Sequence, residues 1–431
     1  MSVNAGNLNL SIEQAGRVLN AAFKQASGQS VISQLATGDY VSIATMAQRV
    51  GYESMTNALS QVLTRTYIRV RPYTAKFPAL IKTEEQFGNM VRKVQYIDRD
   101  IPEGDMTRTL EDGKEYSPYK VRKPVAVQTA YYGFNHVDDY ITIFKNQWDT
   151  ALTSGSELQR FISGIMQEWY NKLEQYHEQY SRATIINLIG GTSEASKVDS
   201  KHPEMVRHLL TEYNTEHGTT LTRDALLADK DAFTQFAEDL AYKMDIIVRQ
   251  MGERTTLYHV SPAQSVVEGD KAKGGGSATY YPLKRHTPRE NLQCYMLAPF
   301  WDRVKRTVRP GLFANEYLEF IKFDEVAYWQ DIQAPEQVNA DVSYFKSVAV
   351  TPALSSGNTY ALVNDSAEAA VELPYVLGIM FDDEAASICY KNMWSAATPM
   401  NPAHGFQTNY IHEDMQWRND NTENACLLLL D

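Results

Sequence analysis

Apolar residues recur at helical spacing in two long segments of the chain. From Thr150 to Leu188, apolar residues three and four positions apart share one face, and polar residues occupy the other. Gly190-Gly191 follows and predicts the end of this helix, because glycine commonly lies just past a helix C-terminus. A helix of that length spans on the order of 50 Å. A second helix is predicted from Lys230 to Met251, with a face made of Phe233, Phe236, Leu240, Met244, Ile247 and Met251.

The N-terminal part of the chain predicts several short helices. Ser11 and Gln14 have the spacing of a capping box, and Gly28 fits the end of the helix that they begin. Two more short helices are expected over Val41–Val50 and Ser54–Thr66. Alone, such helices bury too little apolar surface to be stable. We therefore expect an N-terminal arm that depends on packing against something else.

The pattern changes to an extended one from Val91 to Phe134. Two alternating segments flank a polar stretch, and its prolines and glycines argue against a helix. Acids and bases balance there, seven against seven from Lys93 to Lys123. The pattern predicts a long two-stranded hairpin with a charged tip. Such a hairpin is marginal in isolation, so we expect it to lie against the chain's own core or against a neighbouring subunit.

The rest of the chain predicts short elements and an α+β class. No internal repeat of fixed period is visible. A strand-then-helix segment is expected over 376–394, with Asp382-Asp383-Glu384 capping the helix. The last stretch, 406–431, predicts a polar two-stranded hairpin that ends in the apolar strand Cys426–Leu430. Further strands are expected at 255–261, Leu318–Phe323, Ser347–Val350 and Tyr360–Val363.

Composition and charge narrow the function classes. The chain has 431 residues, 43% hydrophobic and 22% charged, which excludes disordered, collagen-like and disulfide-framework proteins. Its net charge of −12 argues against nonspecific binding of nucleic acid by the whole chain. Lys271–Arg309 carries nine Lys/Arg and two acids, whereas Gly311–Asp431 carries four Lys/Arg and eighteen acids. These blocks fit charge pairing between subunits or within one chain.

Localisation signals and cysteines point to a reducing compartment. No run of about 18 apolar residues is present, so we expect no membrane span. The N-terminus lacks the basic and apolar regions of a secretory signal. Cys294, Cys389 and Cys426 are odd in number and widely spaced, which favours free thiols. The 26 tyrosines against 15 phenylalanines suit extensive interfaces, or reflect compositional drift.

A search for chemistry finds no catalytic constellation. Gly274–Gly276 stands in a polar stretch with no helix after it, which is unlike a phosphate-binding loop. Ser117–Lys120 has SxxK spacing, but Pro118 argues against the helix that this motif requires. Asp382–Glu384 could hold a divalent cation or cap a helix. His202, His208 and His412 lie near acids, as metal ligands or as solvated side chains. We expect no catalytic, cofactor-binding or metal site, and no cofactor.

The order of parts resembles the major capsid protein of tailed bacteriophages, the Hong Kong 97-type fold. The extended segments VRKVQYIDR and YKVRKPVAVQTAYYGF resemble its E-loop, and Leu158–Leu188 resembles its spine helix. VLGIMFDDEAASICY resembles the strand and helix near the end of the axial domain, and NYIHEDMQWRNDNTENACLLLLD the closing strands. The similarity covers nearly the whole chain and rests on layout more than on a diagnostic motif.

The resemblance implies a division of the chain into five parts. They are an N-terminal arm (1–82), an extended E-loop hairpin (83–135), a peripheral domain with the long spine helix (136–229), an axial domain with an insertion expected near 264–310 (230–400), and the closing strands of the peripheral domain (401–431). Some family members crosslink an E-loop lysine to a neighbour's asparagine. Lys114 is a conceivable donor, but neither the asparagine nor the assisting acid can be chosen from the sequence.

The resemblance also implies a structural function and a set of partners. Copies of the chain are expected to self-assemble through the E-loop and N-terminal arm into hexamers and pentamers of an icosahedral phage head. That head would enclose double-stranded DNA without sequence-specific binding, and would form in the host bacterial cytoplasm. A portal protein and scaffolding or decoration proteins are further expected partners. Two alternatives stay open, an encapsulin-like nanocompartment shell and an uncharacterised α+β enzyme.

Overall fold

A computed structural model describes most of the chain in separate stretches. The described residues are 77, 80–82, 90–96, 126–132, 135–147, 155–198, 203–261, 264–268, 277–281, 283–307, 322–345, 360–362, 366–399 and 401–431. The predicted helices before residue 70, the hairpin tip, Gly274–Gly276 and the strand expected at Ser347–Val350 therefore lie outside the described residues.

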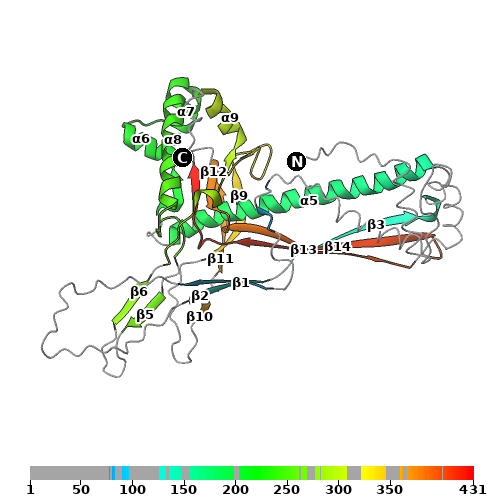
Figure 1. The fold of residues 1–431 in the computed structure, drawn as a ribbon. Coiled ribbons are helices and arrows are strands. Elements are labelled where there is room, and N and C mark those ends of the chain that lie inside the picture. The colour runs from blue at the N-terminus through cyan, green and yellow to red at the C-terminus, as the bar shows by residue number, and fades with distance from the viewer. Residues whose placement is uncertain are drawn as a thin grey trace, which may run out of the picture. The chain divides into compact units, whose positions relative to one another are not determined.

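The described elements include both helices and strands, and the last eight of them are all strands (Figure 1). The helices are α5 (Gly155–Val198), α6 (Leu209–His217), α7 (Arg223–Ala228), α8 (Lys230–Met251) and α9 (Ala298–Thr307). The strands are β1 (Met90–Tyr96), β2 (Ala126–Tyr132), β3 (Asn135–Phe144), β4 (Val206–His208), β5 (Gln264–Glu268), β6 (Ser277–Tyr281), β7 (Leu292–Leu297), β8 (Lys322–Val326), β9 (Val338–Phe345), β10 (Tyr360–Leu362), β11 (Ser366–Leu373), β12 (Val376–Asp382), β13 (Ala386–Ala397), β14 (Phe406–Asn419) and β15 (Ala425–Leu429). None of the described helices combines the length and hydrophobicity that crossing a lipid bilayer requires.

Contacts divide the chain into two units. The first comprises Met1–Phe87, Phe134–Ser181 and Cys389–Gln416, and the second comprises Gly88–Gly133, Arg182–Ile388 and Trp417–Asp431. In the first unit, strands β13, β14 and β3 form a sheet in that order. β14 and β3 pair antiparallel, from Phe406 opposite Phe144 to Met415 opposite Asn135.

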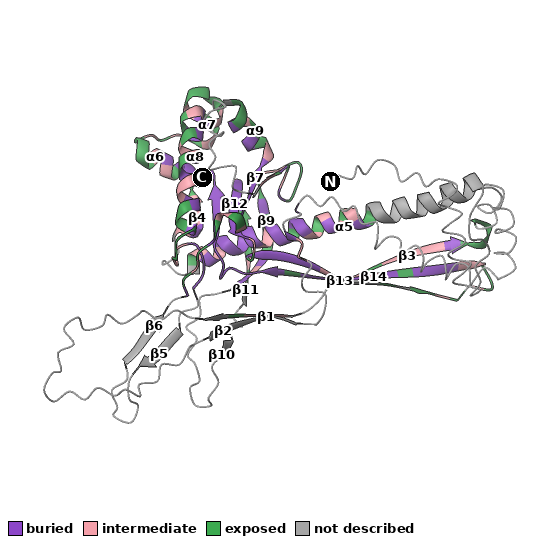
Figure 2. Cartoon of the chain, in the orientation of Figure 1, coloured by how far each residue is buried: buried purple, intermediate pink, exposed green. Residues whose placement is uncertain are grey.

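The core of the second unit is a five-stranded sheet with the order β4-β15-β12-β7-β8. Every residue of β7, β12 and β15 is buried (Figure 2). Strands buried on both faces are near-continuously apolar, which explains the sequences LQCYML and ACLLL. Two antiparallel pairs, β9 with β11 and β5 with β6, and the sheet β1-β2-β10 complete this unit.

The second predicted helix is confirmed, because α8 begins at Lys230 and ends at Met251 as predicted. Asp229 caps it, because its side chain accepts hydrogen bonds from the backbone N–H groups of Asp231 and Ala232. The predicted apolar face, from Phe233 to Met251, is buried. The same residues therefore specify both the helix and the side that packs on the core.

The predicted end of the long helix at Gly190-Gly191 is wrong, because α5 continues to Val198. A Cβ on Gly190 would lie 2.6 Å from Cγ1 of Val342 in β9, and one on Gly191 would lie 3.4 Å from the carbonyl oxygen of Ser343. The two glycines thus let strand β9 approach the helix closely, a role that glycine also serves inside a helix.

The predicted helix after Asp382 is also wrong. The strand β12 is confirmed, but Asp383–Ala385 form a turn and β13 follows. In that turn the carboxylate of Asp382 accepts hydrogen bonds from the backbone N–H of Glu384 and from the hydroxyl of Thr287. Acids that resemble a helix start in sequence here stabilise a turn between two strands.

Two further strand predictions fail, and two are confirmed. Residues 255–261 form no strand apart from an isolated bridge between Thr255 and Arg285. The expected C-terminal hairpin is absent, because β14 pairs with β3 whereas β15 pairs with β12 and β4. Strand β15 itself is confirmed, as is β10 at Tyr360–Leu362. The strand expected at Leu318–Phe323 overlaps the start of β8 (Lys322–Val326), and residues 318–321 lie outside the described part of the chain.

Candidate functional site

The two strands at the base of the predicted charged hairpin are present in the second unit. β1 and β2 pair antiparallel over their whole length, with Lys93 opposite Thr129. Strand β10 adds to β2 in parallel. The residues between β1 and β2 are outside the described part of the chain. What the structure shows is therefore how the base of this extended segment is held.

A buried polar segment faces this base. All of the residues from Arg418 to Asn424, which comprise the end of β14 and its connection to β15, are at least 91% buried. Buried polar groups require partners, and several are present. The carboxylate of Asp420 accepts from the backbone N–H and hydroxyl of Thr422, the amide of Asn421 donates to the carbonyl oxygen of Gly191, and the amide of Asn424 donates to Thr287 Oγ1.

Lys93 is the cation that joins strand β1 to this segment. Its Nζ lies 2.8 Å from Oδ2 of Asp420 and also contacts Oε1 of Glu423. Arg285 adds a second cation, with Nη2 2.9 Å from the same Glu423 oxygen. The side chains of Lys93, Asp420 and Glu423 are 15%, 0% and 9% exposed, so the charges interact with little screening by water. We call these four residues, Lys93, Arg285, Asp420 and Glu423, the buried ion cluster.

The environment of the buried ion cluster shifts the pKa of its members. Burial alone would lower the pKa of Lys93, but the charges of Asp420 and Glu423 and the hydrogen bonds to both raise it above its usual value. Burial acts to raise the pKa of Asp420, yet Lys93 and Thr422 hold it well below its usual range. Burial raises the pKa of Glu423 in spite of Lys93. Asp420 is thus the carboxylate that Lys93 most firmly keeps ionised.

A second buried pair lies in the first unit, between α5 and β14. Nε2 of His177 and Oε2 of Glu413 are 2.7 Å apart, and each side chain is 3% exposed. The ring of Tyr390 lies 4.3 Å from the imidazole, between centroids. Nearby, the amide of Asn135 in β3 donates to the hydroxyl of Tyr180. These bonds fix the helix to the sheet.

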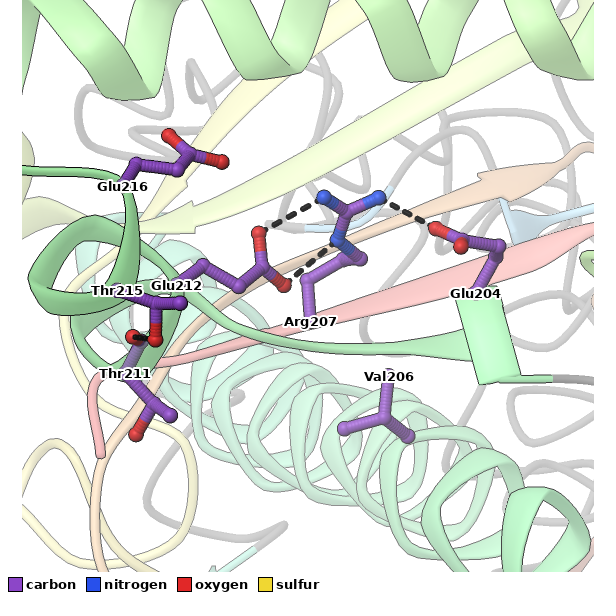
Figure 3. A pocket seen from close by; sticks show the side chains of 7 residues that line it. All are labelled: Glu204, Val206, Arg207, Thr211, Glu212, Thr215 and Glu216. Carbon is purple, nitrogen blue, oxygen red and sulfur yellow. Dashed lines mark hydrogen bonds and ion pairs between the residues drawn. The ribbon is translucent and has the colours of Figure 1, made fainter.

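A pocket of about 350 Å³ in the second unit carries a network of charges (Figure 3). Its lining residues are Glu204, Val206, Arg207, Thr211, Glu212, Thr215 and Glu216. The guanidinium of Arg207 donates to both carboxylate oxygens of Glu212, at 2.8 and 2.7 Å, and to Glu204. Nζ of Lys243 in α8 lies 3.2 Å from Oε2 of Glu216. The cations are paired with the acids, so the network stabilises the fold.

The residues singled out for chemistry do not come together in the structure. His208 contacts Asp431, and His412 contacts Asp138. Among the residues that the structure describes, no group of three or more His, Cys, Asp or Glu could hold a metal ion. His202, Lys114 and Ser117–Lys120 lie outside the described residues. The three cysteines are free and buried, and burial raises the pKa of the Cys294 and Cys426 thiols.

The alternating pattern from Val91 predicts the strand that carries Lys93, but the sequence did not predict the buried ion cluster. Asp420 and Glu423 belong to a run of polar residues, and such a run normally indicates an exposed turn. The available signal was indirect: the run leads without a break into the apolar strand at Cys426. A strand that is buried from its first residue requires the preceding residues to enter the core as well.

Comparison with known proteins identifies the family. A family model described as "Phi29-like phage major capsid protein" matches residues 19–429. Nothing matches among curated proteins. Solved structures that are similar include the capsid of Staphylococcus phage Andhra (10% identity, TM-score 0.47, 84% of this chain and 86% of that one) and the capsid asymmetric unit of cyanophage Pam1 (12%, 0.40, 84% and 93%). The mature capsid asymmetric unit of bacteriophage PhiM1 is also similar (9%, 0.37, 84% and 88%).

The family match agrees with the described elements. It spans nearly the whole chain and includes the paired strands β1 and β2, the long helix α5 and the C-terminal strand β15. The fold is the Hong Kong 97-type capsid fold that the order of parts predicted, and the encapsulin and enzyme alternatives are not favoured. The chain belongs to the Phi29-like phage major capsid protein family, and is a capsid component of a virion.

Proposed function

We propose that copies of this chain assemble into the hexamers and pentamers of an icosahedral phage head that encloses double-stranded DNA. The observation that carries this proposal is the family match over residues 19–429, since a major capsid protein builds a multimeric shell. Closed shells of this kind distribute many small contacts over symmetric copies, which makes assembly cooperative.

The parts of the chain take different roles in this proposal. The arm (1–82) and E-loop (83–135) contact neighbouring copies, and the peripheral domain (136–229) supplies a rigid spine. The axial domain (230–400), with an insertion near 264–310, lies at the hexamer and pentamer axes, and 401–431 closes the peripheral domain. The length of α5, 44 residues or about 65 Å, supports the spine role. The buried ion cluster supports an E-loop anchored at its base and extended beyond it.

Charge supports a passive relation to the packaged DNA and a structural, non-enzymatic role. A chain of net charge −12 repels phosphate, so the DNA is enclosed without sequence-specific contacts. The ion pairs described above are mutually satisfied, which suits a scaffold rather than a reacting group. We expect the shell to form in the host bacterial cytoplasm, with a portal protein at one vertex and with scaffolding or decoration proteins as further partners.

Electron microscopy tests this proposal directly. The full chain is expressed in bacteria, once alone and once with the other head genes of its phage, and each product is imaged in negative stain and sized by light scattering. Closed shells, or rings of five and six copies, are expected in at least the second preparation. A monomer or dimer at every concentration in both preparations would contradict a shell-forming function.

A further inference from the structure

The sheet β13-β14-β3 of the first unit has two different faces. Tyr140 lies opposite Tyr410 and Thr142 lies opposite Thr408, so even-numbered residues of both strands share one face. From Gln407 to Met415 the odd-numbered residues of β14 are buried, and Glu413 among them bonds to His177 of α5. Helix α5 therefore covers the odd-numbered face. We call the even-numbered face the outer sheet face.

Large aromatic side chains are exposed on the outer sheet face. Tyr140, Phe144, Trp394 and Tyr410 are 63%, 46%, 51% and 38% exposed. The rings contact one another across the strands: the Tyr140 and Tyr410 centroids are 5.9 Å apart, and Trp394 stacks on His412 at 3.9 Å. An exposed patch of this kind, with its rings already fixed by neighbours, indicates a binding surface.

The charges on the outer sheet face are acidic. Asp138 is 63% exposed and Asp414 is 21% exposed, and each contacts a histidine of the facing strand. Where β3 and β14 pair, from Phe406 opposite Phe144 to Met415 opposite Asn135, no even-numbered residue of either strand is a lysine or an arginine, and the one arginine of β14, Arg418, lies beyond this stretch and is buried. An occupant that complements this face must therefore combine cations with groups that pack on aromatic rings.

One segment of the chain has that composition. Residues 65–76, RTYIRVRPYTAK, carry four cations, and no Asp or Glu occurs anywhere between Glu53 and Glu84. Tyrosines and β-branched residues separate the arginines. The segment leads into Phe77 and Leu80, which are 1% and 0% exposed and so hold this end of the segment in place.

We propose that residues 65–76 dock on the outer sheet face of their own chain, which leaves the earlier part of the arm to contact neighbouring copies. Guanidinium groups bind the faces of tyrosine and tryptophan rings by cation–π interaction, and Asp138 and Asp414 supply the opposite charge. Fully extended, twelve residues span about 40 Å, and the ten residues of β3 span about 34 Å, so the segment is long enough to run the length of this face. Because Phe77 tethers the segment to the unit that carries the face, its effective concentration there is high compared with that of another copy.

Crosslinking tests whether residues 65–76 lie on the outer sheet face, and whether they belong to the same chain as that face. Thr74→Cys and Tyr140→Cys are combined, and a mixture of isotopically heavy and light full-length chains is treated with a short bismaleimide. The native cysteines are buried and therefore react slowly. Links within single chains are expected. Tyr242→Cys, which replaces a tyrosine of equal exposure (65%) on α8, is the matched control and is expected to give at least tenfold fewer links.

The other crosslinking outcomes overturn the proposal. Links found only between heavy and light chains would show that the segment of another copy binds this face. An absence of links at Tyr140→Cys would show that the segment does not bind this face. Neither outcome bears on whether shells form, so this test is independent of the proposed function.

Protection from proteolysis gives a second readout. Docking shields the peptide bond after Arg69, so trypsin cleaves it slowly. Replacing Tyr140 and Tyr410 by serine is expected to raise the initial cleavage rate at this bond about tenfold, the loss of two cation–π contacts. Tyr242→Ser is the control and is expected to leave the rate unchanged. An unchanged rate in the Tyr140→Ser/Tyr410→Ser variant would show that the outer sheet face does not hold the segment.

Discussion

Lys93 places an ammonium group between two carboxylates that the fold keeps away from water. Lys93→Met removes the cation and leaves Asp420 and Glu423 close together without it. Breaking a buried pair in this way destabilises proteins by about 3–5 kcal/mol. We expect a loss of that size in the free energy of unfolding, measured by urea denaturation of the unassembled full chain with tryptophan fluorescence as the probe.

The control for Lys93→Met is a lysine whose ion pair is exposed. Lys197 is 63% exposed and pairs with Glu194, so Lys197→Met is expected to change the free energy of unfolding by less than about 0.5 kcal/mol. Adding Asp420→Asn to Lys93→Met removes the uncompensated charge, because Glu423 still pairs with Arg285, and is expected to recover part of the loss. Equal stabilities of the two single variants would contradict a stabilising role for the buried ion cluster.

The raised pKa of Lys93 gives the cluster a defined pH dependence. A lysine with a raised pKa in the folded state stabilises fully below its unfolded pKa of about 10.4, and this stabilisation is lost as pH rises through the folded value. The difference in free energy of unfolding between the native chain and Lys93→Met is therefore expected to shrink above about pH 10.4. Taking the difference cancels the titration of the tyrosines, and a difference that stays constant from pH 9 to 11.5 would contradict the shifted pKa.

At the scale of elements, the contact between α5 and β9 can be tested by one substitution, through the sign of the change that it causes in the free energy of unfolding. Gly→Ala at an open position inside a helix stabilises by roughly 0.5–1 kcal/mol. At Gly190 the added methyl group would instead lie 2.6 Å from Cγ1 of Val342, so Gly190→Ala is expected to destabilise by about 1–3 kcal/mol. Urea denaturation of the full chain measures the change.

A double-mutant cycle separates this contact from other effects of Gly190→Ala. Val342→Ala removes the methyl groups that the new side chain would meet, so the two substitutions together are expected to cost less than the sum of their separate effects. If Gly190→Ala stabilises the chain, or if the two effects are additive, the close approach of β9 to the helix is wrong.

Local pattern predicted the elements better than it predicted their partners. Helix α8 follows from its own periodicity and its Asp229 cap, and the β1–β2 pair follows from alternation. By contrast, β14 pairs with β3, which lies about 270 positions earlier, and no local signal distinguishes that partner from β15. The glycine pair of α5 locally predicts a helix end, and the acids at the end of β12 locally predict a helix start. Tertiary contacts determine a different structure at both places. The buried ion cluster was missed for the same reason, since its members meet only after long-range pairing.

At the scale of the whole molecule, the excess of acids sets the behaviour of the chain toward DNA. Nonspecific DNA binding depends on neutralising phosphates with lysine and arginine, and weakens steeply as salt rises. With a net charge of −12, the chain is expected to show no saturable binding of a 30-base-pair duplex up to about 10 μM at 50 mM salt, although residues 65–76 and Lys271–Arg309 are locally basic. Fluorescence anisotropy of a labelled duplex measures this, with a basic DNA-binding protein of similar size as the positive control. Saturable binding that weakens at least tenfold between 50 and 200 mM salt would show that a basic segment overcomes the repulsion, and the DNA would then be held by the shell rather than merely enclosed.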